Sequence, residues 1–277
     1  MIVLIDAGNT LVKFGWLDPD TGQREARVLA LDHANLAALD DWLDRLAREP
    51  AAAVGVTVAH PGLAAQLQTL FRRRRCEIRW IDSLSAAPGV RNAYDPAGQL
   101  GADRWVSLVG LSRHVAREPS ARAEPALMLA TFGTASTIDT LDPDDDAGRG
   151  DRVFRGGVIL PGPAVMRTAL AGSTALLPDA EGSVADFPTH TLQAIATGIA
   201  AAQAGALARQ WLAGLDRFGL APRVFCAGGA WPLVETEARR LLARVQRQAG
   251  VDPAPLEWLA TPVLNGLAAM ALDPVST

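Results

Sequence analysis

The run DAGNTLVK near the start of the chain holds the first residues whose types and spacing suit a chemical task. Gly8 separates an apolar run from an alternating one, as the turn of a β-hairpin does. A glycine turn lets backbone N–H groups approach an anion closely, and the side chains of Asn9 and Thr10 add donors. Asp6 could hold Mg²⁺, directly or through water, and Lys13 could neutralise phosphate charge. The plainer alternative for the lysine is an exposed strand position without a ligand.

A second hairpin of this kind lies further along the chain. LIDAGNTLVK (4–13) aligns without gaps on LATFGTASTI (129–138), an offset of 125 residues, so that Gly8 falls on Gly133 and Thr134 follows. Chance similarity between two glycine turns is one explanation. The other is an internal duplication, in which two hairpins face each other across a cleft and grip the phosphates of one nucleotide from both sides.

The segment YDPAGQLGADR (94–104) is the third candidate. Gly101 permits a tight bend just before a predicted helix, and Asp103 and Arg104 fall in its first turn. The modest explanation is helix capping, because the helix dipole favours an acidic residue there. The chemical explanation is a general base beside a guanidinium fork that binds a carboxylate.

These residues need an α/β framework to position them. Short apolar or alternating runs with turns between them predict strands, and leucines at helical spacing predict helices. The predicted strands cover 2–6, 11–16, 26–31, 54–58, 76–81, 126–141 as a hairpin, 156–162 and 223–227. The predicted helices cover 34–48, 62–74, 102–117, 163–170, 190–214, 232–248 and 262–272. A change in composition near 118–125 suggests an N-terminal lobe at 1–120 and a C-terminal lobe at 121–277.

The bulk properties limit the partners. Of the 277 residues, 49% are hydrophobic and 20% are charged, which is typical of a globular protein with a substantial core. A net charge of −4 argues against nucleic acid as a partner. The N-terminus lacks the features of a signal peptide, and the uncharged stretch 187–208 is interpreted as a buried helix rich in small residues, not a membrane span. We therefore expect a cytoplasmic protein.

The two hairpins resemble the phosphate motifs of the actin-like ATPase superfamily, which would give two actin-like (ribonuclease H-like) α/β lobes with the active site in the cleft between them. An ordered set of motifs over most of the chain resembles, more specifically, the type III pantothenate kinases. The motifs are DAGNT (6–10), YDPAGQLGADR (94–104), GTASTID (133–139), GGVILPG (156–162), TLQAIATG (191–198) and LNGL (264–267).

This resemblance implies an ATP-dependent kinase that phosphorylates the primary hydroxyl of pantothenate to 4′-phosphopantothenate, the first step of coenzyme A biosynthesis. The residues implied to bind ATP and magnesium are Asp6, Gly8, Asn9, Thr10, Lys13, Gly133 and Thr134. Those implied to line the pantothenate pocket are Tyr94, Gly101, Ala102, Asp103, Arg104 and Thr191. Asp103 would be the catalytic base. Thr191 would reach the substrate from the partner subunit of a homodimer, although an N-cap of the long helix is a compatible explanation.

The sequence departs from the family pattern at Thr131. Members commonly have Asp at this place and use it for a monovalent cation, K⁺ or NH₄⁺, so this cation site is in doubt here. Three other functions stay open at this point: another small-alcohol or acid kinase, a nucleotide-binding regulatory or interaction protein, and a hydrolase of phosphate chains.

Overall fold

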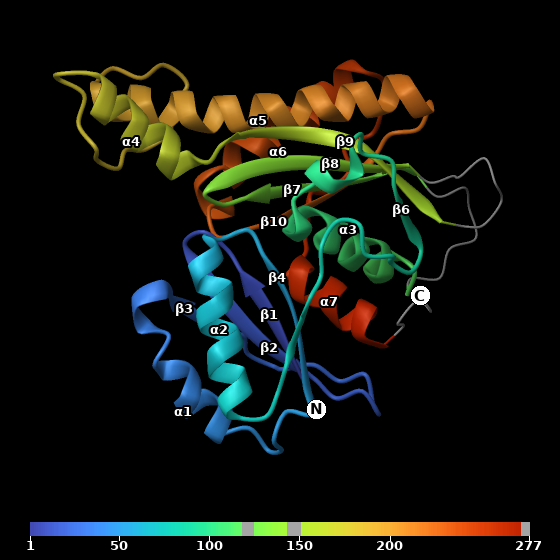
Figure 1. Ribbon diagram of the computed structural model, residues 1–277. Helices are drawn as coiled ribbons and strands as arrows, with labels where there is room; N and C mark the ends of the chain where they lie inside the picture. Colours follow the sequence, from blue (N-terminus) through green and yellow to red (C-terminus); the bar gives the residue numbers. More distant parts are fainter. Residues whose placement is uncertain (118–124, 143–150, 273–277) are drawn as a thin grey trace. The chain divides into compact units, whose positions relative to one another are not determined.

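The computed structural model describes residues 1–117, 125–142 and 151–272 (Figure 1). The chain divides into two compact units. Unit 1 contains residues 1–120, 144–154 and 261–277, and unit 2 contains residues 121–143 and 155–260. The expected lobes were continuous, whereas the last helix, α7 (Pro262–Leu272), groups with unit 1.

Unit 1 is built on a five-stranded sheet in the order β3-β2-β1-β4-β5. Its strands are β1 (Ile2–Ala7), β2 (Leu11–Leu17), β3 (Leu29–Asp32), β4 (Ala52–Thr57) and β5 (Ile78–Trp80). β1, β2 and β3 pair antiparallel, while β4 is parallel to β1 and β5 is parallel to β4. The first hairpin is therefore at the centre of the sheet.

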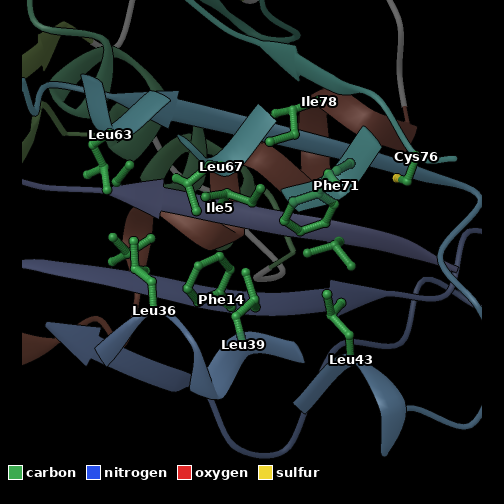
Figure 2. Close-up of a cluster of buried hydrophobic side chains, with 14 residues drawn as sticks. Ile5, Phe14, Leu36, Leu39, Leu43, Leu63, Leu67, Phe71, Cys76 and Ile78 are labelled. Carbon is green, nitrogen blue, oxygen red and sulfur yellow. The ribbon is translucent and has the colours of Figure 1, made fainter. Parts of the chain in front are cut away.

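Two helices, α1 (Ala38–Asp44) and α2 (Pro61–Arg73), cover one face of this sheet. Figure 2 shows the core beneath them, in which Ile5 and Phe14 meet Leu39 and Leu67. Because side chains alternate along a strand, burial of Ile5 on this face directs Asp6 to the opposite face. α7 contacts β1, and α3 (Ala102–Val115) contacts β4.

α3 and α7 pack against each other with almost no space between their backbones. A Cβ atom on Gly110 of α3 would lie 2.2 Å from the carbonyl oxygen of Pro262, and one on Gly266 of α7 would lie 1.9 Å from that of Val106. Side chains larger than hydrogen do not fit at such a crossing. The two glycines thus hold α3, the helix that begins at the predicted substrate segment, against α7.

Unit 2 repeats the plan of unit 1. Its strands are β7 (Leu127–Phe132), β8 (Ala135–Asp142), β9 (Arg152–Pro161), β10 (Arg223–Ala227) and β11 (Glu257–Trp258), and the first three residues of β9 group with unit 1. The second sheet has the order β11-β10-β7-β8-β9-β6, in which β6 (Val90–Asn92) pairs with the first three residues of β9. If the strands of each unit are numbered one to five along the chain, β1–β5 in unit 1 and β7–β11 in unit 2, both sheets have the order 3-2-1-4-5. The duplicated α/β fold expected from the sequence is therefore confirmed.

The helices of unit 2 are α4 (Pro163–Ser173), α5 (Thr191–Phe218) and α6 (Glu235–Gln248). α5 and α6 cover the face of β7 from which Ala130 and Phe132 project. α4 packs against α5, as Figure 1 shows. Three single-turn 3₁₀ helices also occur in the described chain: His33–Asn35, Ala97–Gln99 and Trp231–Leu233.

The expected burial of the small-residue helix is only partly right. α5 is the one described helix that is long and apolar enough to cross a membrane by length and composition, which is weak evidence of such a role. Ile199, Leu207 and Trp211 are buried in unit 2, yet only 33% of its most apolar window is buried. Ala and Gly residues on the other face cover little area, so much of this helix is open to solvent in the single chain.

Candidate active site

The first hairpin places Asp6 and Lys13 directly opposite each other on neighbouring strands. The Lys13 ammonium lies 3.5 Å from the Asp6 carboxylate. The Gly8 N–H donates to the Leu11 carbonyl at 3.1 Å and closes the turn, which leaves Asn9 exposed at its tip. The structure therefore gathers a carboxylate, a cation and an exposed glycine turn, which is the set that the sequence predicted here.

The second hairpin has the same shape with a turn shorter by one residue. Ala7 pairs with Val12 across four residues (8–11), whereas Phe132 pairs with Ser136 across three (133–135). The ungapped alignment expected from the sequence is therefore wrong beyond the turn, where every position slips by one.

This correction decides which residues correspond. Thr131 lies opposite Thr137, as Asp6 lies opposite Lys13. Both charged residues of the first hairpin are thus replaced by threonines in the second. Gly133 keeps the turn, because its N–H donates to the Ala135 carbonyl at 3.1 Å, and Thr134 is exposed at the tip. Gly133 and Thr134 belong to unit 2, while Asp6 and Lys13 belong to unit 1.

Asp103 lies in the first turn of α3, as predicted. The N-cap of this helix is Gly101, which has no side chain to cap it, and the Arg104 N–H donates to Asp103 Oδ1 at 2.8 Å. A Cβ atom on Gly101 would lie 2.7 Å from that oxygen, so the glycine leaves room for the carboxylate. Ala102 is the first residue of the helix. Part of the capping explanation is therefore correct, since this carboxylate accepts a backbone N–H of the first turn.

The electrostatics link Asp103 to the first hairpin. Burial raises the pKa of Asp103 above its usual range, although the Arg104 backbone N–H and guanidinium oppose this. Burial also raises the pKa of Asp6; Lys13 lowers it and the negative charge of Asp103 raises it further. Two carboxylates that repel each other at a partly buried place form a site that favours a cation or a proton.

Arg104 lies against a pair of aromatic rings. The rings of Tyr94 and Phe154 stack at 5.8 Å with 4° between their planes, and the guanidinium carbon is 5.7 Å from each ring centre. Only 7% of Arg104 is exposed. Contacts of a guanidinium with aromatic faces fix its plane, and hence the direction of its N–H groups. Sequence reasoning missed Phe154, because the predicted strand began at residue 156, whereas β9 begins at Arg152.

Thr191 is the first residue of α5, and the N-cap is His190, without a side-chain capping bond. The N-cap alternative for Thr191 is therefore wrong. The threonine lines an open groove of about 550 Å³ in unit 2, together with Met166, Leu170, Pro188, Ile195 and Gly198. The groove is predominantly apolar, and no other predicted site residue lines it.

No cluster of three or more His, Cys, Asp or Glu side chains that could hold a metal occurs in residues 1–117, 125–142 and 151–272. This does not conflict with magnesium, which usually keeps several waters and takes one or two carboxylates plus phosphates of the substrate. Asp6, whose pKa is raised in part by the charge of Asp103, fits this requirement as a single carboxylate.

The duplicated sheet order and the two glycine hairpins define the class of protein as an α/β fold of the actin-like kind. The family model of type III pantothenate kinase matches residues 2–213. A type III pantothenate kinase of Bordetella bronchiseptica is 51% identical over 273 residues, which are 98% of this chain and 97% of the relative. One of Bordetella pertussis is 50% identical over 279 residues and covers 100% of both chains. The chain belongs to the type III pantothenate kinase family.

Proposed function

We propose that this protein transfers the γ-phosphoryl group of ATP to the primary hydroxyl of pantothenate, giving 4′-phosphopantothenate and ADP, the first step of coenzyme A biosynthesis. The observation that carries the proposal is the arrangement of Asp103 and Arg104 at the start of α3, with Asp103 close enough to raise the pKa of Asp6. Membership of the family favours this function over a regulatory nucleotide-binding protein, a phosphate-chain hydrolase or a kinase of another small alcohol.

Asp103 acts as the general base. The hydroxyl oxygen of pantothenate attacks the γ-phosphorus, the bond from that phosphorus to the bridging oxygen of ADP breaks, and the hydroxyl proton passes to Asp103. A buried carboxylate with a raised pKa holds this proton better than an exposed one, which suits a base that works near neutral pH.

Arg104 binds the carboxylate of pantothenate, and Tyr94, Gly101 and Ala102 line the same pocket. The support is the aromatic pair that fixes the guanidinium plane, since a fixed fork gives both affinity and orientation. Orientation matters in phosphoryl transfer, where catalysis rests on positioning and on neutralisation of charge.

Each of the two hairpins binds phosphate groups of ATP. In the first, Gly8, Asn9 and Thr10 supply turn donors and Lys13 supplies positive charge. In the second, Gly133 and Thr134 supply the donors. Asp6 would hold magnesium, directly or through water, and the bound ion would supply positive charge against the transferred group.

We further propose that the site for a monovalent cation is weak or differently built. Thr131 occupies the place in unit 2 that Asp6 occupies in unit 1, so one formal negative charge is missing there. Thr131→Asp should then strengthen activation by K⁺ or NH₄⁺. An equal response to K⁺ in the two proteins would show that this position does not set the requirement.

The active form is proposed to be a homodimer in the cytoplasm, with Thr191 reaching the substrate of the partner subunit. Thr191 opens onto an apolar groove, and α5 leaves much of its apolar surface exposed. Leu176 and Phe187 on the segment between α4 and α5 are 92% and 90% exposed, which leaves two more large apolar side chains available to a partner. Light scattering over a dilution series tests this, and a fully active monomer would contradict it.

Release of ADP with and without pantothenate tests the proposed function. The wild-type protein with Mg²⁺ and ATP should release ADP only when pantothenate is present. ADP release that does not depend on pantothenate would favour a hydrolase. ADP release that depends on another alcohol would favour a different kinase.

A further inference from the structure

The residue that follows the third strand in each unit contacts the glycine turn of that unit. In unit 1 this residue is His33, which follows β3, and in unit 2 it is Gly162, which follows β9. The sequence motifs give no role to His33. The repeated topology gives the two residues equivalent places, and the contacts that each one makes are different.

His33 bonds to the carbonyl of the turn glycine itself. Its Nε2 lies 3.0 Å from the Gly8 oxygen. A carbonyl can only accept, so Nε2 carries the hydrogen and donates it. The pairing of Leu11 with Asp32 brings the end of β3 beside the turn.

A local network fixes the place of His33. Asp32 Oδ1 accepts the N–H groups of Ala34 and Asn35 at 3.0 and 2.9 Å, and Asn35 Nδ2 donates to Asp32 Oδ2 at 2.8 Å. These bonds shape the single helical turn that begins at His33. The imidazole therefore starts from an ordered backbone although its side chain is exposed.

Gly162 supports the second turn through its backbone. Its N–H donates to the Thr134 carbonyl at 2.9 Å. A Cβ atom at this position would lie 1.9 Å from the Gly133 oxygen and 2.7 Å from the Thr134 oxygen. The contact with Gly133 is thus possible only without a side chain at 162.

Both contacts set the direction of a peptide plane. The carbonyl of Gly8 and the N–H of Asn9 belong to one planar trans peptide, so they point in opposite directions. A bond that holds the carbonyl toward His33 therefore directs the Asn9 N–H away from it. In the second turn, the bond from the Gly162 N–H holds the Thr134 carbonyl toward Gly162, and it therefore directs the Ala135 N–H of the same peptide away from Gly162. These N–H groups lie at the exposed tips proposed to bind phosphate.

We infer that His33 and Gly162 are positioning residues, which orient the N–H donors of the two phosphate-binding turns without touching the substrate. The inference rests on the proposed function of these turns, and it predicts an effect confined to the nucleotide.

The test compares the wild type with His33→Ala and His33→Gln. The Kd of an unreactive ATP analogue with Mg²⁺ is measured by calorimetry without pantothenate, and KM for both substrates is measured in the ADP assay. Loss of one neutral hydrogen bond should raise the Kd and KM for nucleotide by about two- to tenfold, while KM for pantothenate stays within about twofold. His33→Gln keeps an N–H donor and should recover part of the loss.

The matched control is His60→Ala. His60 accepts the Gly62 N–H at 3.1 Å as the N-cap of α2, so its loss should lower the melting temperature without changing nucleotide affinity. If His33→Ala leaves the Kd for nucleotide unaltered, as His60→Ala should, the inference is wrong, whether or not the melting temperature of His33→Ala changes.

The second arm compares Gly162→Ala, at the N-cap of α4, with Gly172→Ala inside α4. A Cβ atom on Gly172 meets nothing within 4 Å. Gly162→Ala should weaken nucleotide binding about tenfold or more, since the new Cβ displaces the turn itself. Gly172→Ala should leave affinity unchanged. If Gly162→Ala does not fold, the His33 variants decide alone. If the wild-type protein binds nucleotide but does not phosphorylate pantothenate, the proposed function is wrong. The inference about His33 and Gly162 would still hold in that case, because it concerns nucleotide binding alone.

Discussion

At the scale of single residues, the surroundings of Asp103 separate a base from a helix cap. If Asp103 takes the hydroxyl proton, Asp103→Asn should lower turnover by roughly 10²–10⁴. A mere cap would leave turnover intact and cost about 0.3–1 kcal/mol of stability on substitution. Steady-state kinetics and melting curves of the two proteins distinguish these outcomes. Near-normal turnover with a lower melting temperature would favour the cap.

The raised pKa of Asp103 also has a consequence for stability. Burial raises the pKa of Asp103 in the folded protein above its unfolded value of about 3.9. At a pH between these two pKa values, the folded protein therefore binds this proton more fully than the unfolded chain does. The ionised carboxylate therefore costs stability at neutral pH, and this cost disappears as the pH falls through the folded-state pKa. Asp103→Asn should melt no lower than the wild type at pH 7, and its advantage should shrink toward pH 4. A difference in melting temperature that does not change with pH would contradict the assignment.

Arg104 permits a test of substrate recognition. Arg104→Lys keeps the charge but loses the planar fork, so KM for pantothenate should rise about tenfold while kcat changes less. Arg91→Lys, at an exposed position of β6, is the matched control and should change neither constant. Equal kinetics for Arg104→Lys and the wild type would remove Arg104 from the pocket.

Much of the site in unit 1 could be predicted from the sequence, because its residues lie close together in short motifs. Asp6, Gly8 and Lys13 share one hairpin, and Asp103 and Arg104 share one helical turn. The partners of these motifs could not be predicted. Phe154 reaches Tyr94 through the pairing of β6 with β9, a contact between segments about sixty residues apart that no local pattern records.

At the scale of elements, the crossing of α3 and α7 positions the proposed base. Gly266→Ala puts a Cβ atom 1.9 Å from the Val106 carbonyl oxygen, and neither backbone can yield easily. We expect a loss of about 1–3 kcal/mol of stability, measured by denaturant unfolding, and a lower kcat because α3 carries Asp103.

Gly205→Ala in α5 is the control for this substitution, since no atom lies within 4 Å of the added Cβ atom. It should stabilise the protein by about 0.5–1 kcal/mol through helix propensity alone. A Gly266→Ala protein as stable as the Gly205→Ala protein would show that the tight crossing is not needed.

The sequence predicted most elements because each is long enough to show its period. The α2, α7 and β10 segments were found within two residues of their bounds. β6 and β11, with three and two residues, are too short for any periodicity, and their pairing partners alone define them. The sequence also did not indicate the one-residue shift of the second hairpin. Turns of three and four residues are distinguished only by which residues pair across the two strands.

At the scale of the whole molecule, the duplication was visible in the sequence as one weak match, and the two sheets confirm it by their common strand order. The exposure of α5 to solvent could not be predicted from the sequence. A helix rich in Ala and Gly has the same composition whether it is covered by its own chain or by a partner, so composition cannot distinguish the two.

Identification of the product tests the central claim most directly. The purified protein is incubated with Mg²⁺, ATP and pantothenate, and the products are followed by ³¹P NMR and mass spectrometry beside an Asp103→Asn control. The account predicts a phosphate monoester on the primary hydroxyl of pantothenate, formed in equal amounts with ADP and almost absent in the control. ADP formed without phosphorylated pantothenate, or equal product from both proteins, would contradict it.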